Sequence, residues 1–118
     1  MMPPTHLNEP SRAIPIQDRY DVVVCGGGPA GIAAAISAGR AGARTCIIEL
    51  QCCLGGIWTA GVLCYILDSI NKAGLIVEIR ERLRARGAIG ETLDLYDAEA
   101  MKLLLDEMCA EAGVDIRL

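Results

Sequence analysis

The chain reads DVVVCGGGPAGIAAAISAGRAGARTCIIE over residues 21–49. A valine run at residues 22–24 predicts a buried parallel strand, an alanine-rich run predicts a helix, and residues 45–48 predict a second strand. Three glycines between the first strand and the helix form the pattern G-x-G-x-x-G, and an acid closes the second strand (Gly26, Gly28, Gly31 and Glu49). The acid follows the glycines by about 20 positions, the spacing of a βαβ unit that binds a dinucleotide.

Each residue of this pattern has a separate physical reason. Gly26 permits a sharp turn, Gly28 leaves room for a pyrophosphate to touch the backbone, and Gly31 lets the helix lie close to the strand. Pro29 suits the first helical position, where free amides and the helix dipole favour a phosphate. A carboxylate at Glu49 can accept both hydroxyls of an adenosine ribose and would repel a 2′-phosphate.

Two other interpretations of the stretch are weaker. A glycine-rich turn could belong to another α/β protein, but here it follows a strand, precedes a helix and is followed by an acid. The uncharged residues 22–38 could also suggest a signal peptide or a membrane span. Three adjacent glycines and Pro29 would break such a segment, and it is shorter than the roughly 20 residues that a span needs.

The composition indicates one globular domain. The chain has 118 residues, of which 53% are hydrophobic, but it contains no Phe and one Trp, so the core must consist of Ala, Val, Ile and Leu. A formal net charge of −4 argues against nucleic acid or an anionic membrane as a partner. The sequence has no evident secretion or lipidation signal, which predicts a cytoplasmic protein.

Six cysteines raise the question of a disulfide or metal site (Cys25, Cys46, Cys52, Cys53, Cys64 and Cys109). Cys25 and Cys46 fall in the predicted strands and Cys109 in a predicted helix, where they are expected to be small buried side chains. No C-x-x-C is present, and the single histidine, His6, lies near the N-terminus, so no metal site is expected. The adjacent Cys52 and Cys53 could close only a strained ring, which leaves a redox role as a minor alternative.

Two segments carry weaker signals. Residues 1–18 hold four of the five prolines and predict an irregular extension, with Ile14 and Ile16 laid against the body of the domain. Residues 62–70 are apolar and favour a short helix.

The C-terminal half predicts two longer helices and a third strand. Residues 72–86 have helical apolar spacing, with Asn71 as the expected N-cap. Residues 98–112 form the next helix, capped by Asp97, and residues 114–118 form the strand. Right-handed crossovers then give a three-stranded parallel sheet in the order 3-2-1.

Charged residues in this half are assigned structural roles. Four arginines lie in the last turns of the predicted helix over residues 72–86, and a solvated face with a Glu78–Arg82 pair accounts for them better than an anion site does.

Gly39 and Gly42 are expected to end the helix that follows the glycine pattern.

Beyond this pattern, the sequence resembles the FAD-dependent oxidoreductases of the glutathione-reductase-like superfamily, flavoproteins with two dinucleotide-binding folds. The resemblance runs from about Asn8 to Leu118 and is carried by GGGPAG, LGGIWTAG, ERLRARG and DAEAMKLLLDEMCAEAGVDI. It implies FAD as the cofactor, with the pyrophosphate at the first glycines, the ribose on the acid and the flavin arm along a second glycine pair. The implied cofactor-binding residues are Gly26, Gly27, Gly28, Pro29, Ala30, Gly31, Glu49, Gly55 and Gly56.

The sequence also departs from that superfamily. Its disulfide reductases place C-x-x-x-x-C after the glycine pair, whereas residues 57–61 here read IWTAG, so no dithiol relay is predicted. Trp58 and Thr59 could approach the isoalloxazine, although Trp58 could equally pack beneath the loop. No catalytic acid or base is assigned, because capping explains Asp97 of the pair Asp94 and Asp97.

These observations lead to one main hypothesis and two alternatives. A doubly wound sheet continues beyond its first strand, and residues 114–118 leave nothing to build that half. Residues 19–118 are therefore predicted to be the N-terminal part of an FAD/NAD(P)-binding Rossmann-like domain, completed by the remaining part of an enzyme or by a partner subunit. The alternatives are the NAD-binding domain of a dehydrogenase and a truncated, non-catalytic nucleotide-binding fragment.

Overall fold

A computed structural model describes residues 9–69 and 71–118 as an α/β structure. The predicted extension is thus described only from residue 9, and His6 lies outside the described residues. The elements are β1 (Val22–Cys25), α1 (Pro29–Arg40), β2 (Thr45–Ile48), η1 (Gly56–Trp58), α2 (Leu75–Ala85), α3 (Ala98–Glu111) and β3 (Asp115–Arg117).

The three strands form a parallel sheet in the order β1-β2-β3, with β2 in the centre. In the register of these strands, Val23 of β1 pairs with Cys46 of β2, and Ile47 of β2 pairs with Ile116 of β3. This order is the predicted 3-2-1 arrangement read from the opposite edge. The predicted fold class and the bounds of β2 are confirmed.

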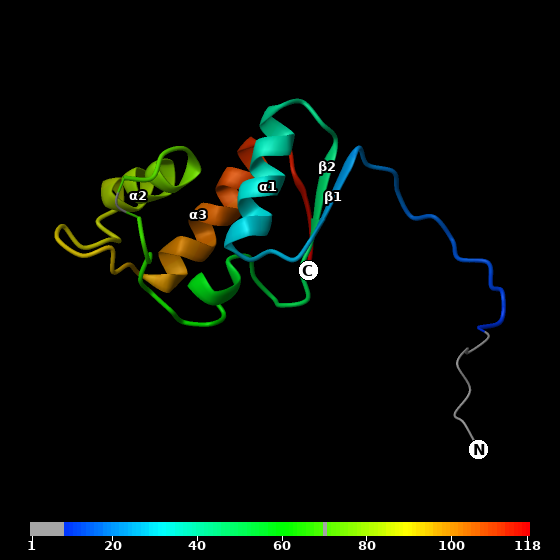
Figure 1. Cartoon of the computed structure of the whole chain (residues 1–118), viewed down its shortest axis with the longest axis horizontal. Coiled ribbons are helices and arrows are strands. Elements are labelled where there is room, and N and C mark those ends of the chain that lie inside the picture. The colour runs from blue at the N-terminus through cyan, green and yellow to red at the C-terminus, as the bar shows by residue number, and fades with distance from the viewer. Residues whose placement is uncertain (1–8, 70) are drawn as a thin grey trace, which may run out of the picture.

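Helices α1 and α3 cover one face of the sheet, and α2 packs on α3 on the side away from the strands (Figure 1). The core lies between the sheet and these helices, and its fully buried side chains are mostly aliphatic, as the shortage of aromatic residues predicted, with Met101, Met108 and Cys109 buried among them. Its members include Ile32, Ile36, Ile47, Met101 and Leu105.

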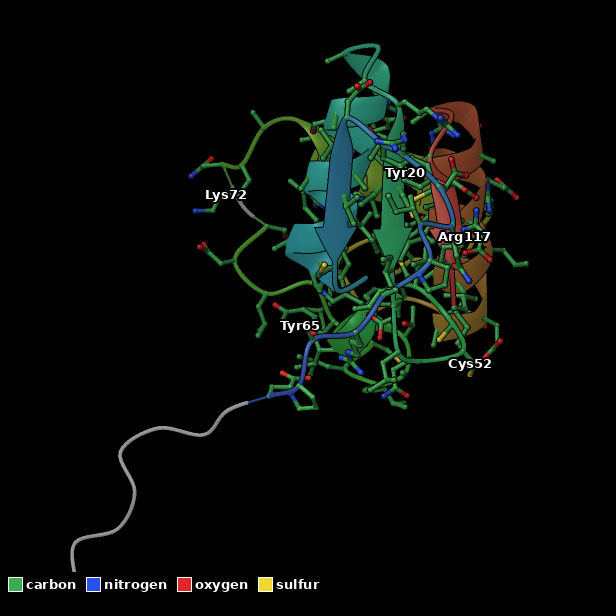
Figure 2. The ribbon with its side chains drawn as sticks, turned by 90° about the vertical axis from the view of Figure 1, so that its right-hand side faces the viewer. Tyr20, Cys52, Tyr65, Lys72 and Arg117 are labelled. Atoms are coloured by element: carbon green, nitrogen blue, oxygen red, sulfur yellow. The ribbon has the colours of Figure 1, made fainter. Side chains whose placement is uncertain are left out.

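The opposite face of the sheet is partly open, and Figure 2 views the molecule from that side. Val23 is 51% exposed and Ile48 47% exposed. Cys25 is exposed here too, which corrects the expectation that it is buried, because alternate residues of a strand face opposite sides. Ile14 and Ile16 line a groove beside Val23 and Ile48, but both stay mostly exposed, so the extension covers this face incompletely.

Residues 18–20 tie the extension to β3 and to Arg44, the residue directly before β2. Tyr20 donates a hydrogen bond to Asp115 in β3, and the Arg44 guanidinium stacks over the Tyr20 ring at 5.0 Å. Arg44 also donates to Asp18 at 2.7 Å. Figure 2 shows Tyr20 and Arg117 on this open side of the molecule.

The glycine at the end of α1 has a different role from the predicted one. Gly39 lies inside α1, and a Cβ there would stand 2.4 Å from the Ala112 carbonyl oxygen. The missing side chain therefore lets α1 touch the end of α3. The helix ends one residue later, at Arg40, and Gly42 follows in a left-handed conformation with φ +89°.

The segment between β2 and α3 differs most from prediction. Helix α2 begins at Leu75 after Gly74 rather than at residue 72 after Asn71, because Asn71 and Gly74 both have positive φ. Residues 62–69 form no helix, and Tyr65 instead makes an antiparallel bridge to Leu95. Residue 70, the end of the predicted short helix, lies outside the described residues.

Helix α3 begins as predicted, with the Asp97 side chain accepting a hydrogen bond from the Ala100 amide at 2.9 Å. The predicted Glu78–Arg82 pair is also present at 2.8 Å. Arg82 pairs in addition with Glu111 of α3 at 2.6 Å, so the arginine-rich face joins two helices. No helix in the described part of the chain is long and apolar enough to cross a membrane.

Candidate dinucleotide site

The turn between β1 and α1 is shaped by its glycines. Gly26 has φ +105°, a conformation that side chains disfavour, and its amide donates to the Ile48 carbonyl at 2.8 Å. Gly31 packs against this turn, because a Cβ on it would stand 1.9 Å from the Gly26 carbonyl oxygen. The first and last glycines of the pattern thus act as the sequence predicted, one in the turn and one in the helix contact.

Gly28 differs from both. A Cβ on Gly28 would meet no atom of residues 9–69 or 71–118 within 4 Å, and the φ of −71° at Gly28 is one that any residue can adopt. Folding therefore gives no reason for glycine at this position. Open space over the backbone is what the close approach of a pyrophosphate requires.

The start of α1 is also suited to an anion. Pro29 occupies the first turn, and no side chain caps the helix or places an acid there. The amides of the first turn and the positive end of the dipole of this 12-residue helix therefore favour a phosphate beside Gly28.

Glu49 follows β2 and turns toward this loop. Its Oε2 atom accepts a hydrogen bond from the Gly27 amide at 2.6 Å, and its Oε1 atom accepts one from the Gln51 amide at 2.8 Å. The amides of Gln51 and Gly27 hold the pKa of the Glu49 carboxyl below its usual range. An ionised carboxylate has about four acceptor positions, so acceptor capacity remains beside these amides for the hydroxyls of a ribose.

The second glycine pair lies directly against the first loop. The Gly55 amide donates to the Gly27 carbonyl at 2.7 Å, and Gly55 has φ +111°. A Cβ on Gly56 would stand 2.9 Å from the Gly28 Cα atom. All nine predicted site residues therefore lie in one continuous region, formed by the first glycine loop, the start of α1, the residue after β2 and the second glycine pair.

The residues that support the second pair were missed from the sequence. Thr59 is 2% exposed, its hydroxyl donates to the Leu54 carbonyl at 2.5 Å, and its side chain packs against Gly55. Leu54 is fully buried beneath Gly27. Trp58 packs against the core, in agreement with the packing alternative. In the sequence, the signal for this support is Leu54, the apolar residue directly before the glycine pair.

No catalytic acid or base emerges near these loops. Asp97 is the N-cap of α3, and Asp94 accepts hydrogen bonds from Ser69 and, at 3.0 Å, from Arg80. Within residues 9–69 and 71–118, no three potential metal ligands gather into one group. The free amides at the start of α1 and the Glu49 carboxylate are groups whose chemistry fits a diphosphate joined to a ribose.

Comparisons with known proteins agree with this geometry. The family described as FAD dependent oxidoreductase matches residues 21–118. The chain is 32% identical to a thiamine thiazole synthase of Desulfosudis oleivorans over 126 aligned positions, 93% of this chain and 46% of that protein. It is 51% identical to a dihydrolipoyl dehydrogenase of Trypanosoma brucei brucei over 100 positions, 77% of this chain and 20% of that one.

The fold of the chain is also similar to that of a solved structure. The crystal structure of Thermovibrio ammonificans THI4 superposes with a TM-score of 0.53 at 25% identity, covering 82% of this chain and 37% of that one. The chain thus spans less than half the length of each of these relatives. Because the family match covers the whole βαβ unit, both glycine loops and β3, the chain belongs to the FAD dependent oxidoreductase family.

Proposed function

We propose that the two glycine loops and Glu49 bind the ADP half of FAD, and that the chain is the FAD-binding portion of a flavin-dependent oxidoreductase. The observation that carries this proposal is the uncapped start of α1, which faces open space at Gly28 beside the Glu49 carboxylate. Family membership supports FAD rather than another dinucleotide.

Each part of the site has a distinct role in this proposal. The amides at the start of α1 would hold the diphosphate, with Gly28 giving it access to the backbone. Glu49 would hold the ribose hydroxyls, while Gly55 and Gly56 would let the flavin arm pass close to the loop. When bound, FAD supplies hydride or two-electron transfer, and the protein supplies binding and orientation.

The half-exposed apolar face of the sheet supports a second element of the proposal. Val23 and Ile48 expose apolar surface of the kind that a complete doubly wound domain covers. We propose that residues 19–118 form the N-terminal part of the FAD-binding domain, and that the remaining part of the enzyme or a partner subunit completes the substrate site.

We also propose a cytoplasmic location without nucleic acid or membrane as a partner. All six cysteines are free thiols, which suits a reducing compartment, and the net charge of −4 disfavours polyanions.

Titration of the purified chain with FAD tests the cofactor assignment. We expect quenching of flavin fluorescence, and competition by ADP because the contacts are made to that half. ADP carrying a 2′-phosphate should compete poorly, since Glu49 would repel it. Binding of NAD without binding of FAD would contradict the proposal and favour a dehydrogenase domain.

The Glu49→Gln variant sharpens this test. Loss of charge-assisted hydrogen bonds to the ribose should weaken FAD binding about 10- to 100-fold. The same variant should reduce the difference between the affinities with which ADP and its 2′-phosphorylated form compete against FAD. An unchanged FAD affinity would mean that Glu49 does not hold the ribose.

A further inference from the structure

Two adjacent thiols lie at the edge of the proposed site and make none of the contacts assigned to FAD. Cys52 and Cys53 follow β2 and directly precede Leu54 and the second glycine pair. Cys52 is exposed, as Figure 2 shows, and Cys53 is half-buried. Both therefore lie within reach of a small reagent from solvent.

The inner thiol is connected to the glycine loops through Thr59. The Cys53 Sγ atom lies 3.8 Å from the Thr59 hydroxyl oxygen and donates a weak hydrogen bond to it. That hydroxyl donates to the Leu54 carbonyl at 2.5 Å, and the Thr59 side chain packs on Gly55. Gly55 in turn donates to the Gly27 carbonyl at 2.7 Å. A change at Cys53 therefore reaches the proposed diphosphate loop through a few direct contacts.

We propose that Cys52 and Cys53 form a reversible thiol–disulfide site that sets the affinity of the adjacent loops for FAD, with small-molecule disulfides as the oxidant. The Cys52 thiolate attacks one sulfur of the oxidant, which forms a mixed disulfide and releases one thiolate. The Cys53 thiolate then attacks the Cys52 sulfur, closes the Cys52–Cys53 bond and releases the second thiolate. Two electrons pass from the cysteine pair to the oxidant, and the two cysteine protons leave with the released thiols.

The closed ring is expected to open readily. Neighbouring Cα atoms are about 3.8 Å apart, closer than the 4.4–6.8 Å typical of disulfides. Strained disulfides of this kind are more easily reduced and are the labile, regulatory ones. The site would therefore return to two thiols whenever the surrounding thiol pool is reducing.

Closing the ring withdraws the Cys53 sulfur from Thr59 and should loosen the packing of Thr59 on Gly55. We expect the affinity for FAD to fall about tenfold, a usual size for coupling between two sites. This part of the inference rests on the function proposed above. The single tryptophan, Trp58, lies beside Thr59 and reports the loop without any flavin.

The experiment treats the full chain with oxidised glutathione, blocks the remaining thiols and maps the cysteines by mass spectrometry. We expect the peptide that holds Cys52 and Cys53 to lose two hydrogens and carry no glutathione. Trp58 emission should change in parallel and recover with dithiothreitol. Cys53→Ser should instead retain glutathione on Cys52, because the resolving thiol is absent.

Cys25→Ser serves as the matched control, since Cys25 is exposed at the end of β1 outside the pair. This variant should form the Cys52–Cys53 bond and change its Trp58 emission as the wild type does. Glutathione that stays on wild-type Cys52, or a ring that forms without altering Trp58 emission, would overturn the inference. Failure of the reduced chain to bind FAD would instead contradict the proposed function, since the mass and Trp58 readouts do not depend on flavin.

Discussion

The βαβ unit of residues 21–49 and the segment of residues 50–97 are held together in different ways. In the first, backbone hydrogen bonds and glycine contacts follow from local spacing, as at Gly26 and Gly31. In the second, hydrogen bonds join positions far apart in the sequence. The Tyr96 amide donates to the Cys64 carbonyl at 3.1 Å, and the Tyr96 hydroxyl lies 2.8 Å from the Trp58 carbonyl oxygen and 2.9 Å from that of Leu63. The contrast shows why the glycine loop can be predicted from its pattern while the segment that supports it cannot.

The largest effect should come from filling the helix contact in the first region. Gly31→Val places a Cβ against the Gly26 carbonyl, a backbone atom that cannot move aside. We expect the free energy of unfolding to fall by about 3 kcal/mol or more, the upper end for overpacking. Urea unfolding, followed by circular dichroism, measures this change in the free energy of unfolding. A stability equal to that of the wild type would mean that α1 does not depend on this contact.

A smaller effect is expected in the second region, at Tyr96, which is 7% exposed. Burial raises the pKa of its hydroxyl, so the group stays protonated and can donate to the carbonyl of Trp58 or of Leu63. Tyr96→Phe leaves these oxygens without that donor and should cost about 1–3 kcal/mol. The same unfolding measurement applies. No change would show that the hydroxyl does not hold this segment to the glycine loop.

The smallest effect concerns the ion pairs that join α1, α2 and α3. Hydrogen bonds from Arg40 and Arg82 hold the pKa values of the Glu78 and Glu111 carboxyls below their usual 4.5. Because the folded pKa values are lowered, this stabilisation is complete above pH 4.5 and is lost as the pH falls through them.

Glu111→Gln should therefore lower the melting temperature at pH 7 by about 2 °C, and the difference should vanish in acid. The exposed Glu91→Gln is a control that should leave the melting temperature unchanged at either pH. A Glu111→Gln difference that persisted in acid would contradict the ion-pair origin.

The sequence allowed the strand order, the bounds of β2 and the cap of α3 to be predicted, because strand and capping patterns are local and crossovers are right-handed. The nine predicted cofactor-binding residues lie together in the structure, and their binding role stays a prediction. The start of α2 was misplaced, since nothing local distinguishes Asn71 from Gly74 as the last residue outside the helix. The role of Gly39 depends on Ala112, which is far away in the sequence. The hydrogen bond between Gly27 and Glu49, and the support from Thr59, likewise appear only once the loops meet.

Gly28→Val, measured by FAD titration beside urea unfolding, tests most directly whether Gly28 serves the ligand rather than the fold. The open space at this Cβ position predicts an unfolding free energy within about 1 kcal/mol of wild type, the scale of helix-start effects. It also predicts that FAD binding is lost, because the valine occupies the place of the diphosphate. A variant that folds normally and binds FAD with wild-type affinity would contradict the account.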